Sequence, residues 1–485
     1  MVSVINKHPY RCGYLIILIG LVVLLAWELL FGYILNSKLV LVKGSQSEHI
    51  WKENLVPIYF KVYMFNWTNP EETLAKKQKP NFQEIGPYTF RFSQPKTNIV
   101  YNKNHTVTFS SDRLWHFEAK KSKGRLSDRI TNINPIAMSV GDRAKSQSFF
   151  KKPFISKFLS FMEKEVYVTK TVEELLFEGY DDRILSMATT LKSWGASVDE
   201  FLPEKFGWYF DKNASSDVTL YNVNTGTDDL NNLGKVNWFN YKTRCGVYSD
   251  RCDQVHGSLG DLWPKNLTKE KIASLYISDF CSSFDLTRME TRRLFWTTGV
   301  QFVGTDRTFD NGNKYYQNRC YCKNNKCNYP SGIRDVSDCV HGPIFLSFPH
   351  FYLASEQYRR DIKGMHPTAE KHQFSITVQK DSGMVMEIFA RLQINVRVEP
   401  FSGLGFFSDL PKMMVPTLWF EEYIEMPSSL SWQVRIAFGL APLLISIIGY
   451  GSIIIGIVCL IYGHISYTIR PIPSPSAPSL KKVKS

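Results

Sequence analysis

The stretch from Ile436 to Tyr462 reads IAFGLAPLLISIIGYGSIIIGIVCLIY, 27 residues without a charged side chain. A membrane-spanning helix needs about 20 mostly apolar residues, so this stretch predicts one. Over the whole chain of 485 residues the mean hydropathy is only -0.19, an ordinary value for a soluble protein. The chain is therefore not a transporter made mostly of such helices, and a large polar domain must lie outside the apolar stretch.

A second apolar segment, Cys12–Leu35, reads CGYLIILIGLVVLLAWELLFGYIL and carries one charge, Glu28. Lys7 and Arg11 precede it, so a cleaved secretory signal is the alternative interpretation. A signal has a shorter apolar core and small residues at its cleavage site, and none follow Leu35. We expect an uncleaved anchor, in which Glu28 reaches the membrane interface rather than serving as a proton relay.

Basic residues flank both apolar segments on the sides that face the chain termini. They are Lys7 and Arg11 before the first segment and Arg470, Lys481, Lys482 and Lys484 after the second. Because basic flanks stay in the cytosol, both tails are predicted to be cytosolic. The predicted division is a cytosolic tail 1–11, a span 12–35, an extracellular domain 36–435, a second span 436–462 and a cytosolic tail 463–485.

N-glycosylation sequons agree with this topology. They begin at Asn66, Asn104, Asn213 and Asn266, all inside the central region. A single sequon arises easily by chance, but none of these lies in a predicted cytosolic tail. We expect glycans at these four asparagines.

Seven of the nine cysteines lie within residues 245–339. The cluster Cys320-Tyr-Cys322-Lys-Asn-Asn-Lys-Cys327 could bind zinc, but it contains no histidine and its compartment is oxidising, so disulfides are favoured. A bridge between Cys320 and Cys322 would be strained, so one of them is expected to pair with Cys327 and the other with a more distant cysteine. Because seven is odd, one thiol is left over.

The central region is predicted to be rich in β-strands. Strand patterns occur at 106–109, 374–378 and, most clearly, 388–398, where apolar and polar residues alternate. The last segment predicts an antiparallel strand with one buried and one solvated face.

Between Phe149 and Leu191 the pattern changes to that of helices. Ile155, Phe158, Leu159 and Met162 follow helical spacing, Thr171–Glu174 is a capping box, and a third helix is expected after Asp181. Phenylalanines at 149, 150, 154, 158 and 161 and lysines at 151, 152, 157, 164 and 170 share this region. Two interpretations remain open: an amphipathic bundle with solvated lysines, or an exposed basic and aromatic patch that captures anionic amphiphiles.

No catalytic motif is present. The sequence contains no nucleophile elbow, zinc-protease helix, phosphate loop or dinucleotide fingerprint, and its ten histidines have no metal-ligand spacing. We therefore expect neither enzymatic activity nor a cofactor nor a metal. The domain is basic, but its compartment favours lipids, lipoproteins, anionic amphiphiles or cell surfaces over nucleic acid as partners. A homo-oligomer is also left open.

Several segments resemble one known family. They are Tyr59–Glu72, Gln83–Arg91, Glu173–Asp181, Asp279–Ser282, the cysteine cluster, Ser347–Phe351 and Phe389–Val396. Together they span nearly the whole chain and are similar to the class B scavenger receptor family, which includes the fatty-acid translocase. The resemblance implies a twisted antiparallel β-barrel core, an apical helical bundle and an internal hydrophobic tunnel, anchored by two transmembrane helices.

The resemblance also implies residue roles. By position it pairs Cys252 with Cys320, Cys281 with Cys339 and Cys322 with Cys327, which leaves Cys245 as the odd thiol. Apical lysines near the tunnel mouth bind ligand in the family. The candidate ligand-binding residues here are Lys151, Lys152, Lys157, Lys164, Lys170, Phe154, Phe158 and Phe161, of which Lys164 is the first choice. The lysines do not align one to one with the family, and Glu178 looks inserted.

The expected function is that of a cell-surface scavenger receptor that binds lipids or lipid-bearing particles at the apex and passes hydrophobic cargo through the tunnel. Fatty acids, sterols, carotenoids, lipoproteins and anionic phospholipids are candidate ligands. One alternative is a recognition receptor for microbes, cells or a protein partner that uses the apex alone. A two-span ligand-gated channel is the other, although the second span has no acidic or amide residue to line a pore.

The tail after Tyr462 contains no acidic di-leucine signal, so the plasma membrane is expected, with endosomal vesicles as a second location. Cys12 and Cys459 lie at the cytosolic ends of the spans. They are candidates for palmitoylation, and buried, unreactive thiols are the equal alternative.

Overall fold

The computed structural model describes residues 9–145, 166–187, 204–401, 405–424 and 426–469. The chain divides into two compact units. One contains residues 1–37, 295–297 and 431–485, and the other contains residues 38–294 and 298–430. The first is called the helix unit below and the second the β domain.

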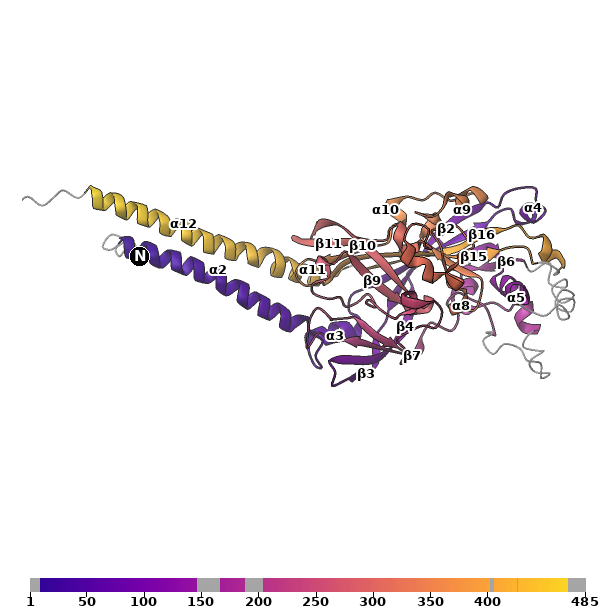
Figure 1. Ribbon diagram of the computed structural model, residues 1–485, viewed down its shortest axis with the longest axis horizontal. Coiled ribbons are helices and arrows are strands. Elements are labelled where there is room, and N and C mark those ends of the chain that lie inside the picture. The colour runs from indigo at the N-terminus through magenta and orange to yellow at the C-terminus, as the bar shows by residue number, and fades with distance from the viewer. Residues whose placement is uncertain (1–8, 146–165, 188–203, 402–404, 425, 470–485) are drawn as a thin grey trace, which may run out of the picture. The chain divides into compact units, whose positions relative to one another are not determined.

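Two long apolar helices dominate the helix unit (Figure 1). Helix α2 spans Pro9–Leu39, while the second helical run consists of α11 (Ser428–Arg435), a π-turn (Ile436–Leu440) and α12 (Ala441–Thr468). Both are long and apolar enough to cross a membrane. They contain the two spans predicted from the sequence.

Glycines bring the two helices of this unit close together. A Cβ atom on Gly20 would lie 2.6 Å from the carbonyl oxygen of Gly449, and one on Gly456 would lie 2.8 Å from the carbonyl oxygen of Gly13. On each helix the two glycines are seven residues apart and so share one face. Small residues of this kind allow the backbones of apolar helices to approach closely.

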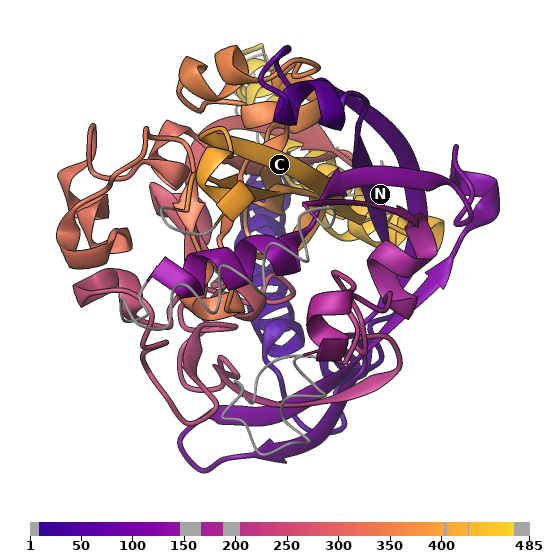
Figure 2. The ribbon, with the colours of Figure 1, turned by 90° about the vertical axis from the view of Figure 1, so that its right-hand side faces the viewer.

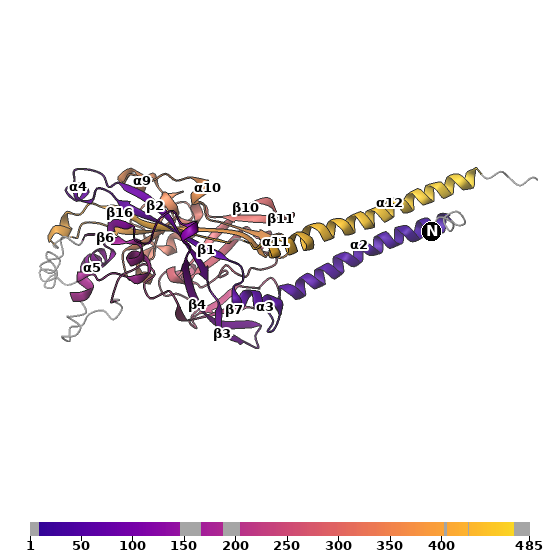
Figure 3. The same cartoon turned by 180° about the vertical axis from the view of Figure 1, so that it is seen from behind.

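The β domain is built on a large antiparallel sheet. Its strands are β1 (Ile58–Trp67), β2 (Phe82–Ser93), β3 (Lys96–Tyr101), β4 (Thr106–Phe117), β7 (Ser215–Asn224), β8 (Val236–Phe239), β9 (Ile272–Ile277), β10 (Ser282–Leu294), β11 (Thr297–Val303), β12 (Arg334–Asp335), β13 (Ile344–Ser347), β14 (Ser375–Gln379), β15 (Val385–Val398) and β16 (Met413–Ile424). The main order is β8-β7-β4-β2-β1-β16-β15-β14-β11-β10-β9. Figure 3 shows β1, β2 and β16 side by side.

Gly257 and Ser258 connect the two edges of this sheet. The backbone N–H of Val236 on β8 donates to the oxygen of Gly257 at 2.9 Å, and the N–H of Tyr276 on β9 donates to the oxygen of Ser258 at 2.8 Å. The sheet is therefore nearly closed into a barrel, which confirms the expected β-rich fold.

Short helices and a second sheet complete the β domain. The helices are α3 (Gln46–Glu53), α4 (Pro70–Leu74), α5 (Pro135–Lys145), α8 (Ser337–Val340), α9 (Glu356–Asp361) and α10 (Ala369–His372), and β5 (Arg129–Ile133) pairs with β6 (Tyr167–Thr171). Figure 2 looks at the domain end-on and shows α5 crossing the end that faces the viewer.

The predicted strands are confirmed, but the predicted solvated face of 388–398 is wrong. Gln393 and Asn395 on β15 are fully buried. The backbone N–H of His350 donates to Gln393 at 2.7 Å, and the Asn395 amide donates to the oxygen of Phe345 at 3.1 Å. The chain between β13 and α10 therefore covers this face, and hydrogen bonds replace the water that the alternating pattern predicted.

Candidate functional site

Most of the predicted ligand-binding residues lie outside the described residues. These are Lys151, Lys152, Lys157, Lys164, Phe154, Phe158 and Phe161. Lys170 is described and lies on strand β6 rather than on a helix, with β-branched neighbours Thr169 and Thr171 that favour a strand. Its Nζ atom lies 4.9 Å from the ring centroid of the buried Tyr180, a cation–π contact.

The described end of the helical insert agrees with the sequence. The backbone N–H of Thr171 donates to the Glu174 carboxylate at 2.8 Å, and the N–H of Glu174 donates to the Thr171 hydroxyl at 3.2 Å. This is the predicted capping box, ahead of a π-helical turn at Glu174–Glu178. The Asp182 carboxylate accepts from the N–H of Ile184 at 2.8 Å and begins the third helix at 183–187.

Aromatic rings line the inner face of the barrel. Phe60 on β1 lies 5.2 Å from Phe420 on β16 and 5.4 Å from Tyr209, measured between ring centroids. Trp115 on β4 lies 5.6 Å from both Tyr209 and Phe177. These rings come from neighbouring strands of the sheet and from Phe177 and Tyr209, so they form one aromatic cluster on its inner face.

An ion pair lies beside this aromatic cluster. Arg113 follows the same face of β4 as Trp115, and its Nη1 atom lies 2.7 Å and 3.0 Å from the two carboxylate oxygens of Asp279. The Arg113 side chain is only 11% exposed, whereas that of Asp279 is 47% exposed. One end of the pair is therefore held inside the protein and the other is reached by water.

Glu422 and Tyr209 lie beside this pair. Glu422 pairs in register with Phe60 and with Ala390, so it shares their inward face. Burial raises the pKa of Glu422 to about 7, against the opposing charge of Arg113 and with a further rise from Asp279. Burial also raises the pKa of Tyr209 well above its usual value, and Glu422 and Asp279 raise it further. Arg113, Tyr209, Asp279 and Glu422 are called the inner polar cluster below.

The Glu422 carboxyl and the Tyr209 hydroxyl make no hydrogen bond to any residue that the structure describes. Glu421, its neighbour, points to the other face and contacts Lys61 at 2.9 Å and Arg391 at 2.6 Å. Both Glu422 and Tyr209 keep part of their surface accessible although protein surrounds them. The two polar groups are therefore available to hydrogen-bond to water or to a ligand.

Sequence reasoning missed this cluster. Its four residues come from β4, the chain after the helical insert, the turn before β10 and β16, so no local spacing connects them. Asp279 does belong to a segment that carries the family resemblance, but nothing in that segment indicates its partner.

A second polar cluster lies on the outer face of β15 and β16. The Glu84 carboxylate contacts Nε2 of His350 at 2.6 Å and accepts from the Trp419 indole at 2.7 Å. Potential ligand atoms of Glu84, His350 and His372 lie within 4.8 Å of one another. Three histidine and carboxylate groups at this distance are a candidate metal site.

The hydrogen bonds of the two rings argue against a metal there. Nδ1 of His350 accepts from the N–H of His366 at 3.1 Å, and Nδ1 of His372 accepts from the N–H of Thr368 at 2.8 Å. Neutral imidazole has one lone pair, so each ring carries its proton on Nε2. Burial lowers the pKa of His372 to about 4. Burial alone would raise the pKa of Glu84, but hydrogen bonds from His350 and Trp419 hold that pKa below its usual value. The cluster is a hydrogen-bonded support for the barrel.

Three disulfides are present in the β domain: Cys252–Cys320, Cys281–Cys339 and Cys322–Cys327. They are the pairs implied by the family resemblance. Cys245 is the remaining thiol of the domain. Its Sγ atom lies 3.4 Å from the Tyr276 hydroxyl, and burial raises the pKa of this thiol, which disfavours the reactive thiolate.

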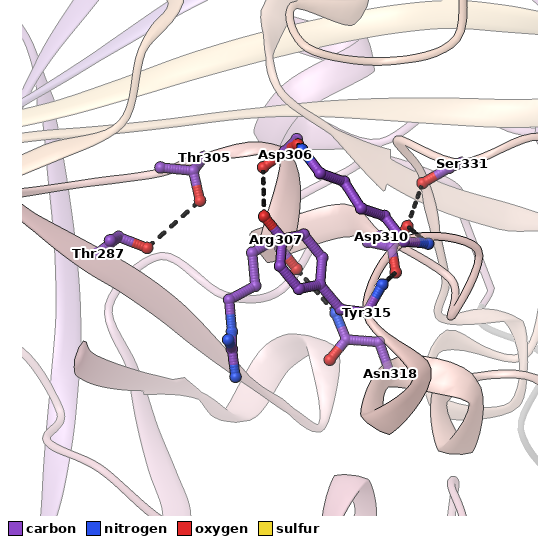
Figure 4. A network of polar contacts seen from close by, with 9 residues as sticks. Thr287, Thr305, Asp306, Arg307, Asp310, Tyr315, Asn318 and Ser331 are labelled. Carbon is purple, nitrogen blue, oxygen red and sulfur yellow. Dashed lines mark hydrogen bonds and ion pairs between the residues drawn. The ribbon is translucent and has the colours of Figure 1, made fainter. Parts of the chain in front are cut away.

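A buried aspartate, Asp310, holds together the loop 310–331, which contains Cys320, Cys322 and Cys327 (Figure 4). Asp310 accepts from the N–H groups of Gly312, Lys314 and Tyr315 and from the Ser331 hydroxyl, at 2.8 to 3.2 Å. The Tyr315 hydroxyl donates to Asp306 at 3.2 Å. Both carboxylate oxygens of Asp310 thus accept hydrogen bonds from the loop itself, so this network has a structural role.

The sequon asparagines differ in exposure. Asn104 and Asn213 are exposed, and Asn66 and Asn266 are partly buried. The Asn66 side-chain oxygen accepts from the N–H of Thr131 at 2.8 Å. Asn213 also bonds through its side chain, to the backbone N–H and oxygen of Trp115, so exposure and not hydrogen bonding distinguishes Asn104 and Asn213 from the other two.

A β-rich domain that lies in sequence between two apolar helices, with three disulfides and an aromatic interior, defines the class of two-span membrane proteins with one large ectodomain. The model of the CD36 family matches residues 11–467. The chain therefore belongs to the CD36 family, the class B scavenger receptors.

Curated relatives agree with this assignment. Protein peste of Drosophila melanogaster is 31% identical over 463 residues, which cover 93% of this chain and 80% of the relative. Scavenger receptor class B member 1 of Mus musculus is 30% identical, covering 84% of this chain and 79% of its own length. Lysosome membrane protein 2 of Homo sapiens is 30% identical, and the match covers 81% of this chain and 80% of that protein.

Proposed function

We propose that this chain binds lipids or lipid-bearing particles at the cell surface and delivers hydrophobic cargo to the membrane through the interior of its barrel. The observation that carries the proposal is the aromatic cluster on the inner face with Glu422 and Tyr209 beside it, two polar groups that bond to no residue the structure describes. Fatty acids, sterols, carotenoids, lipoproteins and anionic phospholipids are the candidate ligands. Membership of a scavenger receptor family supports this choice of ligand class.

The aromatic cluster suits an apolar chain. Phe60, Trp115, Phe177 and Phe420 present ring faces and edges that contact any hydrocarbon without a specific register. A long lipid can therefore slide along these rings at little cost, while the barrel shields it from water.

The inner polar cluster suits the head of an amphiphile. Tyr209 donates a hydrogen bond, and Glu422 donates when neutral and accepts when ionised, so together they match a hydroxyl or a protonated carboxyl group. Arg113 is already paired with Asp279, which leaves no excess positive charge to attract an anion. The cluster therefore favours neutral heads over anionic ones.

Capture of ligands is assigned to the apical segment. Lys164 is the preferred contact, and the other candidates in the same stretch of sequence are Lys151, Lys152, Lys157, Lys170, Phe154, Phe158 and Phe161. The basic side chains would attract anionic particles before cargo enters the barrel.

The proposed location is the plasma membrane, with both tails in the cytosol and endosomal vesicles as a second location. Basic residues on both tails and sequons confined to the central region support this topology.

Binding of a fluorescent sterol to the purified full-length protein in detergent micelles tests the proposal. Ala390→Phe places a ring inside the barrel beside Glu422, and we expect it to reduce saturable binding severalfold. Leu114→Phe is the matched control, because Leu114 lies on the outer face of β4 and is 40% exposed. Equal binding by both variants, or no saturable binding by the wild type, contradicts the proposal.

Cell assays separate the alternatives. Lys164→Glu should reduce uptake of anionic lipid particles. If binding survives Ala390→Phe and is lost only with Lys164→Glu, the chain is a recognition receptor that uses its apex alone. A ligand-evoked current in a patch-clamp recording would instead indicate a channel.

A further inference from the structure

The turn between β10 and β11 consists of two aromatic residues, Phe295 and Trp296. Their φ angles are +50° and +61°, so both backbones are left-handed. A two-residue hairpin loop with positive φ at both positions is the type I′ arrangement, which prefers Asn-Gly. Bulky aromatic residues adopt this conformation at an energetic cost.

Phe295 is partly buried, but packing inside the protein does not explain the tryptophan that follows it. The Trp296 side chain is 64% exposed. A strained backbone that presents a large apolar ring to the outside indicates a binding role for that ring.

The turn belongs to the helix unit. A Cβ atom on Gly439 would lie 3.0 Å from Cβ of Trp296, and the Trp296 ring lies 6.4 Å from that of Trp432, measured between centroids. The Arg435 guanidinium lies 5.9 Å from the rings of both Phe295 and Trp296. The turn therefore lies at the start of the second apolar helix.

Other aromatic rings gather at the same end of the two helices. Trp27 stacks on Phe31 at 5.2 Å, and Phe31 lies edge-on to Phe438 at 5.8 Å. Phe438 is adjacent in sequence to Gly439, which contacts the turn. The rings of α2, the second helical run and the hairpin turn thus form one aromatic belt.

We propose that the Phe295-Trp296 turn is a third membrane contact, inserted into the lipid–water interface of the outer leaflet. The occupant is the bilayer itself, because the turn shares a compact unit with the two helices that are apolar enough to span it. Tryptophan at this depth buries its ring among the upper acyl chains and leaves its indole N–H among polar groups. Arg435, whose guanidinium packs near both rings of the turn, adds a basic residue to the same belt.

Depth-dependent quenching tests this contact. The full-length protein is reconstituted into phosphatidylcholine vesicles, and the contribution of Trp296 is the fluorescence difference between wild type and Trp296→Phe. Lipids brominated near the headgroup end of their chains should quench roughly half of this component, and aqueous iodide should quench little of it. If the Trp296→Phe variant does not fold, Trp296→Tyr replaces it as the variant whose fluorescence is subtracted from that of the wild type.

Tyr316→Trp is the matched control, since Tyr316 lies in the β domain and is 74% exposed. Its added fluorescence should show the reverse pattern, quenched by iodide and not by brominated lipid. If the Trp296 component also follows the iodide pattern, the turn lies in water and the proposal is overturned. No ligand is present in this experiment, so its outcome is independent of the proposed lipid transport.

Discussion

Glu421 and Glu422 are neighbours in sequence with opposite environments. Glu421 contacts two basic side chains on the outer face of β16, whereas Glu422 faces the aromatic interior with only the more distant charge of Arg113 to oppose its burial. The alternation of a β-strand places them on different faces, so one residue is a structural ion pair and the other a titratable group in the binding interior.

Glu422 makes stability depend on pH. Its pKa rises from 4.5 to about 7 on folding, so between these values the folded protein holds a proton that the unfolded chain has lost. The stabilising contribution is present below about pH 4.5 and is lost as the pH rises through about 7, with a total on the order of 3 kcal/mol. Glu422→Gln should remove this part of the decline in unfolding temperature between about pH 5 and about pH 8.

Glu290→Gln is the control for this measurement, because Glu290 is exposed on β10. The unfolding temperature of this variant should decline with rising pH as that of the wild type does. If the Glu422→Gln variant and the wild type show the same dependence of unfolding temperature on pH, Glu422 is ionised throughout and is not enclosed as described.

At the residue scale the sequence predicted the local features and not the distant pairings. The Thr171–Glu174 capping box needs only four consecutive residues and is confirmed. Arg113 and Asp279 meet across 166 residues of chain, a partnership that no spacing rule connects.

At the scale of elements, the strand at 388–398 was predicted correctly and its environment was not. Its alternation is a property of the segment, whereas the burial of Gln393 depends on a different part of the chain, which ends at α10 and lies over it. The apolar helices were the easiest elements to predict, because their length alone distinguishes them.

Glycine packing between α2 and α12 gives a matched pair of variants. A Cβ atom on Gly449 would lie 2.5 Å from the Leu24 side chain, while one on Gly451 meets nothing within 4 Å. We expect Gly449→Val to lower the stability of the helix pair by about 1 to 3 kcal/mol and Gly451→Val to have little effect. Unfolding temperatures in detergent compare them, and equal losses would show that the helices do not pack through this face.

The disulfides should differ in their contributions to stability. Cys252 and Cys320 are separated by 68 residues, and Cys322 and Cys327 by five. Because a longer closed loop restricts the unfolded chain more, replacing the first pair with serines should cost about 2 kcal/mol more than replacing the second. Denaturant unfolding under non-reducing conditions measures both, and a larger cost for the short loop would contradict this order.

At the scale of the whole molecule, the sequence predicts a two-span topology that glycosylation can test. We expect glycans at the exposed Asn104 and Asn213, and a protease added to intact cells should cleave the central region but leave epitopes at both termini intact. Asn104→Gln and Asn213→Gln should each lower the apparent mass on a gel by the amount that one glycan contributes. Cleavage of either terminal epitope in intact cells would reverse the assigned orientation.

Passage of cargo through the barrel is the proposal on which the function depends. A photoactivatable sterol, applied to cells that express the full-length chain and mapped by mass spectrometry, locates the bound lipid directly. We predict labelling, competed by excess unlabelled sterol, on peptides that contain Trp115, Tyr209 and Phe420. Labelling that is absent from these peptides, or that excess sterol does not displace, would contradict an interior route.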